Sequence, residues 1–221
     1  MTSAVVFDLD DTLAITERDR ASLLEIAADR ANVSISFDRA AYLDAHREHS
    51  GTESRRPVFE ALVGSDAPAL TESYREVVGE ALAPVDGVEP LLDTLQRRYP
   101  VGLLTDGPGE TQRDKLRRLG WTDRFDSVVV TGPIEAPKPD RRGFEAVTTE
   151  LESDREETIY VGDDPERDIA GASAAGLDAV QVCYPGGPEP HPSATATIQR
   201  SQLRTLPAVL ETFVGNGAND A

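Results

Sequence analysis

The sequence predicts an α/β fold: a Rossmann-like parallel sheet core with helices on both faces, plus a small all-helical unit inserted after the first strand. Short apolar runs rich in β-branched residues recur along the chain, and segments with helical spacing separate them. Such alternation implies a parallel sheet that is covered on both faces. Between about Thr16 and Leu82, by contrast, the chain has helix-compatible segments and no convincing strand.

The first strand is expected at Ala4–Phe7, a run of apolar residues that ends at Asp8. The insertion follows it and spans residues 15–86. Turn-forming residues from Pro84 onward mark its end. The helices expected within it are Glu17–Ala31, Ala40–Glu48, one that begins at Pro57, and Leu70–Leu82.

Strands and helices alternate regularly after the insertion. The expected strands are Val101–Thr105, Ser127–Val130, Thr158–Val161 and Ala179–Val182. The expected helices are Val88–Arg98, Glu110–Leu119, Arg141–Leu151, Glu166–Ala175 and Gln202–Phe213. Residues 185–196 are rich in Pro and Gly and are expected to form a loop.

Composition narrows the class of protein. The net charge of −18 disfavours binding to nucleic acid or to an anionic membrane surface. No signal segment precedes the first strand and no apolar run approaches membrane-spanning length, so a cytoplasmic protein is expected. The single cysteine, Cys183, fits a reducing compartment. Lysine occurs only at Lys115 and Lys138, and a dispersed acidic, lysine-poor surface is typical of halophilic proteins.

Carboxylates follow the first strand directly, at Asp8 and Asp10. A strand buried on both faces cannot hold an unpaired charge, so Asp8 is expected at the carboxyl end of the strand, where open α/β sheets bind ligands. Two carboxylates at i and i+2 of an extended chain project to the same side. The pair therefore predicts a nucleophile or metal ligand beside an acid/base partner.

A second acid cluster, at Asp163, Asp164 and Asp168, follows the strand Thr158–Val161. If this strand lies next to the first strand, the second cluster brings several carboxylates close to Asp8. These carboxylates would repel one another unless a hard cation bound between them. Oxygen ligands of this kind suit Mg²⁺. Direct ligation is favoured for Asp163. For Asp164 and Asp168, capping the following helix or supporting the ligands is at least as well favoured as direct ligation.

Two smaller signals lie between the acid clusters. The strand Val101–Thr105 ends in a hydroxyl and continues into Asp106 and Gly107, a turn whose N–H groups could face an anion. Lys138 stands between two prolines, which restrict the backbone and limit where its ammonium group can reach. Both segments are candidate contacts for an anionic ligand.

Taken in this order, the four segments resemble the four motifs of the haloacid dehalogenase superfamily, in its subclass with a helical C1-type cap. The resemblance implies a catalytic core of residues 1–14 and 87–221 and a helical cap of residues 15–86. Gln112 and Lys115 further resemble part of a pattern seen in nucleotidases and acylneuraminate phosphatases of this subclass. The chain departs at Asp106, where such members usually carry asparagine.

The resemblance implies a Mg²⁺-dependent phosphatase that acts on a small phosphorylated metabolite through an aspartyl-phosphate. Asp8 would be the nucleophile and Asp10 the acid and base. Mg²⁺ would be held by Asp8, the Asp10 backbone carbonyl and Asp163. The residues expected at the substrate phosphate are Thr105, Asp106, Gly107 and Lys138.

Four other functions compete with this interpretation. A phosphomutase of the β-phosphoglucomutase type would keep the same residues and stays open. A hydrolytic dehalogenase would gain nothing from Asp10 or from a metal-binding cluster. A phospho-accepting signalling module would not need the second acid of the first motif, and receiver domains have no large helical insertion. A binding protein without turnover is disfavoured because no motif residue is missing except the asparagine that Asp106 replaces. The sequence identifies neither the substrate nor the oligomeric state.

Overall fold

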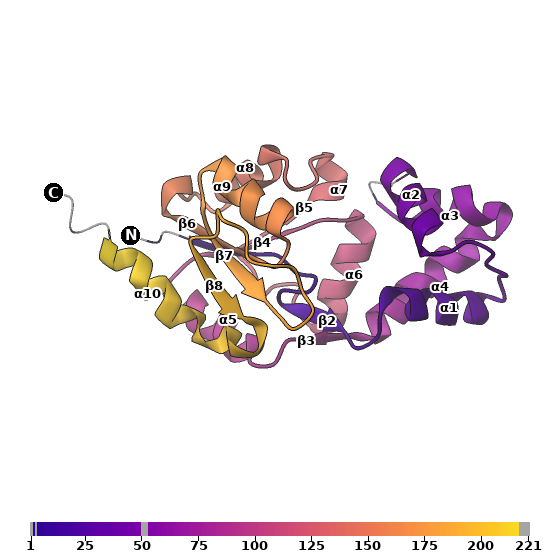
Figure 1. Cartoon of the computed structure of the whole chain (residues 1–221), viewed down its shortest axis with the longest axis horizontal. Coiled ribbons are helices and arrows are strands. Elements are labelled where there is room, and N and C mark those ends of the chain that lie inside the picture. Colours follow the sequence, from indigo (N-terminus) through magenta and orange to yellow (C-terminus); the bar gives the residue numbers. More distant parts are fainter. Residues whose placement is uncertain (1, 3, 50–52, 217–221) are drawn as a thin grey trace.

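The computed structural model describes residues 2, 4–49 and 53–216. At its centre lies a six-stranded sheet in the order β5-β4-β1-β6-β7-β8, in which all neighbouring strands are parallel (Figure 1). This confirms the predicted α/β fold. The strands of the sheet are β1 Ala4–Phe7, β4 Val101–Thr105, β5 Ser127–Val130, β6 Thr158–Gly162, β7 Asp178–Cys183 and β8 Ala196–Gln199.

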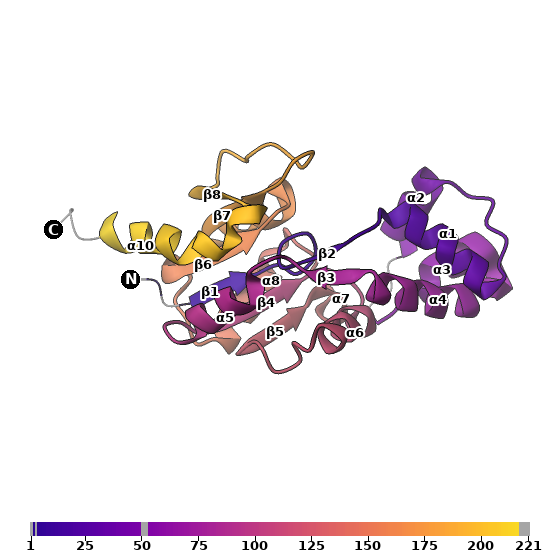
Figure 2. The ribbon, with the colours of Figure 1, turned by 90° about the horizontal axis from the view of Figure 1, so that it is seen from below.

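Helices cover both faces of the sheet because side chains alternate between two apolar layers. Val5 and Phe7 pack with helices α5 and α10, on the face seen in Figure 2, whereas Val6 packs with α8 and α9 on the other face. The helices of the core are α5 Val88–Gln96, α6 Gly109–Leu119, α7 Thr131–Ile134, α8 Arg141–Glu150, α9 Gly171–Ala175 and α10 Leu206–Asn216. The shorter turns are η2 Arg155–Glu157, η3 Pro165–Ala170 and η4 Arg200–Thr205.

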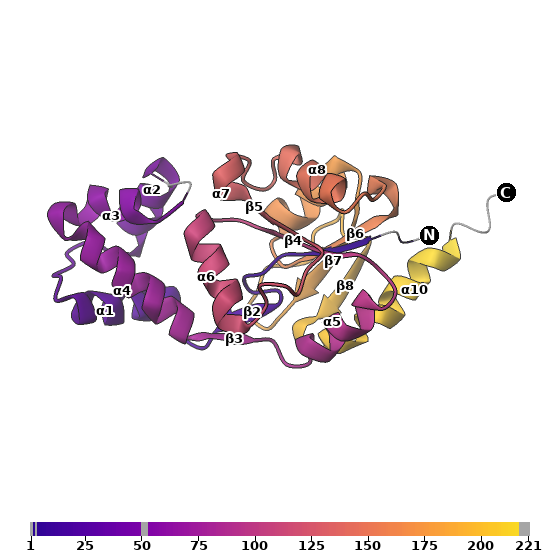
Figure 3. The ribbon, with the colours of Figure 1, turned by 180° about the vertical axis from the view of Figure 1, so that it is seen from behind.

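Four helices form a separate helical unit at one end of the sheet, and α6 lies between the two (Figure 3). This unit has its own apolar core, centred on Leu23, Phe59, Leu70 and Tyr74. Its elements are α1 Arg20–Ala31, α2 Arg39–His49, α3 Arg56–Val63, η1 Gly64–Asp66 and α4 Ala67–Glu80. Asp19 caps α1 by accepting from the N–H groups of Ala21 and Ser22.

Two strands that the sequence did not predict join the helical unit to the core. β2, Ala14–Thr16, and β3, Leu82–Pro84, pair antiparallel as the chain leaves and re-enters the core. Each has three residues, too few to show a period-2 pattern. The link therefore consists of a short ladder rather than two free loops.

The edge strand β8 and the short helix α7 were also missed. Residues up to 196 were expected to be loop, yet Ala196–Gln199 pairs parallel with β7. Only Ile198 of this strand is buried, because an edge strand packs on fewer neighbours, so its sequence lacks the apolar run of a central strand.

Among the described residues, no helix is both long and apolar enough to cross a membrane.

Candidate active site

The carboxyl ends of the three central strands meet at the edge of the sheet that faces the helical unit. β1 lies between β4 and β6, with Phe7 paired to Leu103 on one side and Val161 on the other. Polar residues that follow these strands are therefore neighbours in space, although they are far apart along the chain. This is the edge at which open α/β sheets bind ligands.

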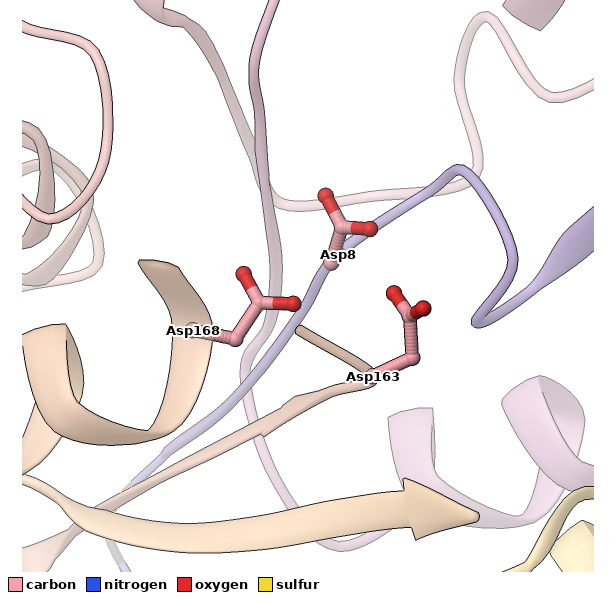
Figure 4. Close-up of side chains that lie close together, drawn as sticks. All are labelled: Asp8, Asp163 and Asp168. Carbon is pink, nitrogen blue, oxygen red and sulfur yellow. The ribbon is translucent and has the colours of Figure 1, made fainter. Parts of the chain in front are cut away.

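Three carboxylates gather at this edge (Figure 4). Asp8 follows β1, Asp163 follows β6, and Asp168 comes from η3. One carboxylate oxygen of each lies within 4.8 Å of the other two. Asp8 is 5% exposed and Asp168 is 1% exposed, so the cluster lies largely out of solvent.

The Lys138 ammonium group bridges two of these carboxylates. Its Nζ lies 2.7 Å from Asp8 Oδ1, 2.7 Å from Asp168 Oδ1 and 3.0 Å from the hydroxyl of Tyr160. Burial opposes the charge on this lysine, but Asp168 and Asp8 together raise its pKa well above the usual value. Lys138 is therefore a fixed cation in contact with the predicted nucleophile.

One ammonium group does not neutralise three carboxylates. Burial, reinforced by Asp168, raises the pKa of Asp8 well above its usual value in spite of Lys138. Burial, Asp168 and Asp11 raise the pKa of Asp163 to about 7. The cluster has a formal charge of −2 when ionised and offers only oxygen atoms, which are the charge and donor set that suit Mg²⁺.

The structure gives Asp164 and Asp168 different tasks. The Asp164 carboxylate caps η3 by accepting from the N–H groups of Glu166 and Arg167. Helix capping was one of the roles that the sequence suggested for this residue. Its own N–H donates to Asp168 Oδ2 at 3.0 Å. Asp168 thus lies within the acidic cluster and at the same time anchors Lys138.

Gly162 leaves the space that Asp168 occupies. It is the last residue of β6, and a Cβ atom placed on it would lie 2.4 Å from Asp168 Oδ2. A side chain at this position would therefore push Asp168 away from the cluster. Close approach is the reason for this glycine, since the tight turn that glycines often permit does not occur here.

Asp10 belongs to a second network, apart from Lys138. Its carboxylate accepts from Lys115 Nζ at 2.5 Å, from Gln112 Nε2 at 3.1 Å and from Arg20 Nη2 at 3.2 Å. Burial opposes its charge, but Lys115 and Arg20 hold the pKa of this carboxyl group well below its usual range. In this arrangement Asp10 is ionised.

Thr105, the last residue of β4, extends the Asp10 network. Thr105 Oγ1 accepts from Gln112 Nε2 at 2.5 Å. Gly107 has a φ of 132°, which disfavours residues with a side chain. These two residues lie at the strand end where the sequence predicted phosphate contacts.

Asp106, which replaces the usual asparagine, is tied to the segment that carries Lys138. Its Oδ1 accepts from Thr131 Oγ1 at 2.9 Å and from the Lys138 backbone N–H at 3.0 Å. Arg167 Nη1 lies 3.6 Å from its Oδ2 and partly offsets the negative charge. The extra charge is thus only partly accommodated, because the buried Oδ2 makes no hydrogen bond with the described residues.

Five side chains of the site were not among the predicted site residues. Lys115 and Gln112 lie three residues apart on one face of α6, and the motif pattern in this helix was the signal that pointed to them. Tyr160 is concealed within an apolar strand. Tyr184, whose hydroxyl donates to Asp163 Oδ2 at 3.2 Å, lies in a loop. Arg20 likewise has no local signal, since it is one of many arginines near a helix start.

Comparison with known proteins agrees with this architecture. Residues 5–182 match the family model of the haloacid dehalogenase-like hydrolases. The chain is 30% identical over 204 residues to ribulose-1,5-bisphosphate 5-phosphatase of Halopiger xanaduensis, covering 81% of this chain and 84% of that protein. It is 29% identical to phosphoserine phosphatase of Thermus thermophilus, covering 91% and 96%.

A solved structure shows the same fold. The putative HAD-hydrolase YfnB of Bacillus subtilis, crystallised with magnesium, superposes with a TM-score of 0.74 at 24% identity, covering 95% of this chain and 99% of that one. The family model spans the sheet as far as β7, the helical unit and all four predicted motifs. The chain therefore belongs to the haloacid dehalogenase-like hydrolases.

Proposed function

We propose that this protein is a Mg²⁺-dependent phosphatase that hydrolyses a small phosphorylated metabolite through an aspartyl-phosphate. The observation that carries the proposal is the position of Asp8, at a strand end in contact with Lys138 and within the acidic cluster. The similar proteins named as phosphatases support a phosphate monoester as substrate.

In the proposed reaction, an oxygen of the Asp8 carboxylate attacks phosphorus in line as the bond to the leaving oxygen breaks. Lys138 holds that carboxylate in place and is suited to neutralising non-bridging oxygens, together with the Thr105 hydroxyl and the backbone N–H groups of Asp106 and Gly107. Mg²⁺, held by Asp8, Asp163 and the Asp10 backbone carbonyl, would offset the charge between carboxylate and phosphate.

Asp10 has the position of the acid and base. Its carboxylate is ionised, which is the protonation state that a base needs to take a proton from the water that hydrolyses the aspartyl-phosphate, although Lys115 and Arg20 also make it a weaker base. Protonating the leaving oxygen in the first step requires this carboxyl group to move away from the two cations. Formation and hydrolysis of the aspartyl-phosphate thus require two different positions of the Asp10 carboxyl group.

We assign residues 15–86 to a cap and residues 1–14 with 87–221 to the catalytic core. The helical unit touches α6 through the Glu53 carbonyl, which accepts from the Glu110 N–H at 3.0 Å, and through Arg75, which lies 3.8 Å from Glu110. These contacts place the unit beside the helix that carries Gln112 and Lys115. A cap in this position would exclude water and contact the leaving group.

The proposal is tested by phosphate release from p-nitrophenyl phosphate and a panel of phosphorylated metabolites, with Mg²⁺ or with EDTA. Release is expected with Mg²⁺, and EDTA is expected to lower it at least about tenfold because three carboxylates would then face the phosphate without a divalent cation. Re-addition of Mg²⁺ serves as the control. Release that is equal in EDTA would overturn the metal assignment, and phosphoryl exchange without net release would indicate a mutase.

Mg²⁺ affinity is expected to fall as the pH is lowered through 7. With a pKa of about 7, Asp163 is about nine-tenths ionised at pH 8 and about one-tenth ionised at pH 6, and metal binding must displace the proton. The raised pKa of Asp8 acts in the same direction. Isothermal titration should give a Kd about tenfold weaker at pH 6 than at pH 8. An affinity independent of pH would contradict the assignment of Asp163 as a ligand.

A further inference from the structure

A pocket beside Asp10 is lined by cations from both the helical unit and the core. Arg20, Arg55, Arg75 and Lys115 line it, against the carboxylates of Glu72 and Glu110. Two of these cations, Arg20 and Lys115, also hold the Asp10 carboxylate. The basic pocket, as we call this space, therefore lies beside the group that would face the leaving oxygen of the substrate.

Arg55 is the cation of the basic pocket that makes no salt bridge with the described residues. Its Nη1 donates to the hydroxyl of Tyr42 at 2.8 Å, and its guanidinium carbon lies 5.8 Å from the centre of the Tyr74 ring. Among the described residues, no carboxylate lies within 4 Å of it. The half-buried guanidinium group is oriented by neutral partners, and the Asp10 carboxylate, more than 4 Å away, only contributes to raising its pKa. A guanidinium group held in this way is suited to binding an anion.

Two buried polar atoms in the wall of the basic pocket also lack a partner. Within the described part of the chain, Thr71 Oγ1 and Arg75 Nε make no hydrogen bond, and both residues line the pocket. Each is a donor, and a buried donor without an acceptor costs free energy. Acceptor atoms of a bound group would satisfy both.

The surroundings of the basic pocket are positive, although the chain carries a net charge of −18. His46, on α2, is affected by this positive charge, because burial, Arg55 and Arg167 lower its pKa to about 4. Four cations against two carboxylates in the lining leave an excess of two positive charges, of which Asp10 offsets one. Positive charge is thus concentrated where the leaving group of a substrate would lie.

We propose that the basic pocket binds a second anionic group on the substrate, so that the enzyme prefers phosphomonoesters whose leaving group carries a phosphate or carboxylate. This inference rests on the proposed function, because it places the leaving group at Asp10. As the two units lie here, the pocket has a volume of about 30 Å³, which is too small for a phosphate group, so entry of the group requires α4 to separate from α6. Arg55 is its central residue.

Two matched pairs of substrates test the proposal. 3-Phosphoglycerate and glycerol 3-phosphate differ by a carboxylate, and fructose 1,6-bisphosphate and fructose 6-phosphate differ by a second phosphate. The wild-type kcat/KM is expected to be at least tenfold higher for the member with the extra anion in at least one pair, and the pair that responds distinguishes the two anions. Arg55→Gln is expected to lower that ratio at least fivefold.

The matched control is Arg56→Gln. Arg56 is the next residue, carries the same charge and pairs with Glu60 at 2.7 Å on the exposed side of α3, so its loss should change the ratio less than twofold. If Arg55→Gln does not fold by circular dichroism, Tyr42→Phe serves instead, because it keeps the charge and removes the hydroxyl that orients it. An equal ratio in wild type and variant would overturn the proposal.

Binding separates failure of this proposal from failure of the proposed function. Isothermal titration of the same pairs into Asp8→Asn reports the basic pocket without turnover. Tighter binding of the doubly anionic member, lost in Asp8→Asn/Arg55→Gln, would support the pocket even if the wild type released no phosphate. Equal binding of both members of each pair would overturn it even if the wild type proved an active phosphatase.

Discussion

Asp8→Asn is expected to lower phosphate release by at least about 10³-fold in kcat, because asparagine cannot form the aspartyl-phosphate. Asparagine has nearly the same shape and its amide oxygen can still accept from Lys138. The measurement is single-turnover and steady-state phosphate release with Mg²⁺ at saturating substrate. A variant that kept more than about a tenth of the activity would refute Asp8 as nucleophile.

The stability of the same variant separates chemistry from folding. The pKa of Asp8 is raised, so its ionised form is disfavoured in the folded protein above the usual carboxyl pKa. Replacing the charge by a neutral amide should therefore leave the melting temperature in EDTA unchanged or higher. The matched control is Asp29→Asn, an exposed aspartate in α1, which should alter neither activity nor stability.

Lys138→Met is expected to cost about 3–5 kcal/mol in the free energy of unfolding, because it leaves two buried carboxylates, on Asp8 and Asp168, without their cation. Loss of its charge at the phosphate should also lower kcat by about 10²- to 10³-fold. Urea unfolding in EDTA measures the first effect and steady-state kinetics the second. Mg²⁺ should restore part of the stability, since a divalent cation neutralises the same carboxylates.

A double variant tests whether the cost comes from the unpaired charges. In Lys138→Met/Asp168→Asn one of the two carboxylates is gone, so the double variant should be more stable than Lys138→Met alone. Arg141→Met is the control, since Arg141 is an exposed cation paired with Glu145, and its loss should change stability by less than about 1 kcal/mol. Equal instability of the single and double variants would show that Lys138 stabilises by packing instead.

Local patterns in the sequence determined most of the fold. Val5, Val6 and Phe7 form an apolar run because both faces of β1 are buried, and the same holds for the other central strands. In the edge strand β8, only Ile198 is buried, so this strand has no apolar run. Strands of three residues, such as β2, have too few positions to show a pattern. The strands that were missed are those with the least buried surface.

The sequence also determined the motif residues. Three of the polar segments stand at the ends of apolar strands, and Lys138 is marked by the prolines on either side of it. Only the tertiary structure decided what each residue does there. Asp164 and Asp168 are the same residue type in one short turn, yet the first caps η3 and the second holds Lys138, and the path of the backbone alone distinguishes them.

The environment of Asp10 likewise could not be derived from sequence. Arg20 comes from the start of α1, whereas Gln112 and Lys115 come from α6, about a hundred residues later. These side chains meet because the helical unit and α6 pack at the same edge of the sheet. Strand and helix formation depends on neighbours in the chain, but the charge around a carboxylate depends on side chains that packing brings together, and that arrangement exists only in the folded protein.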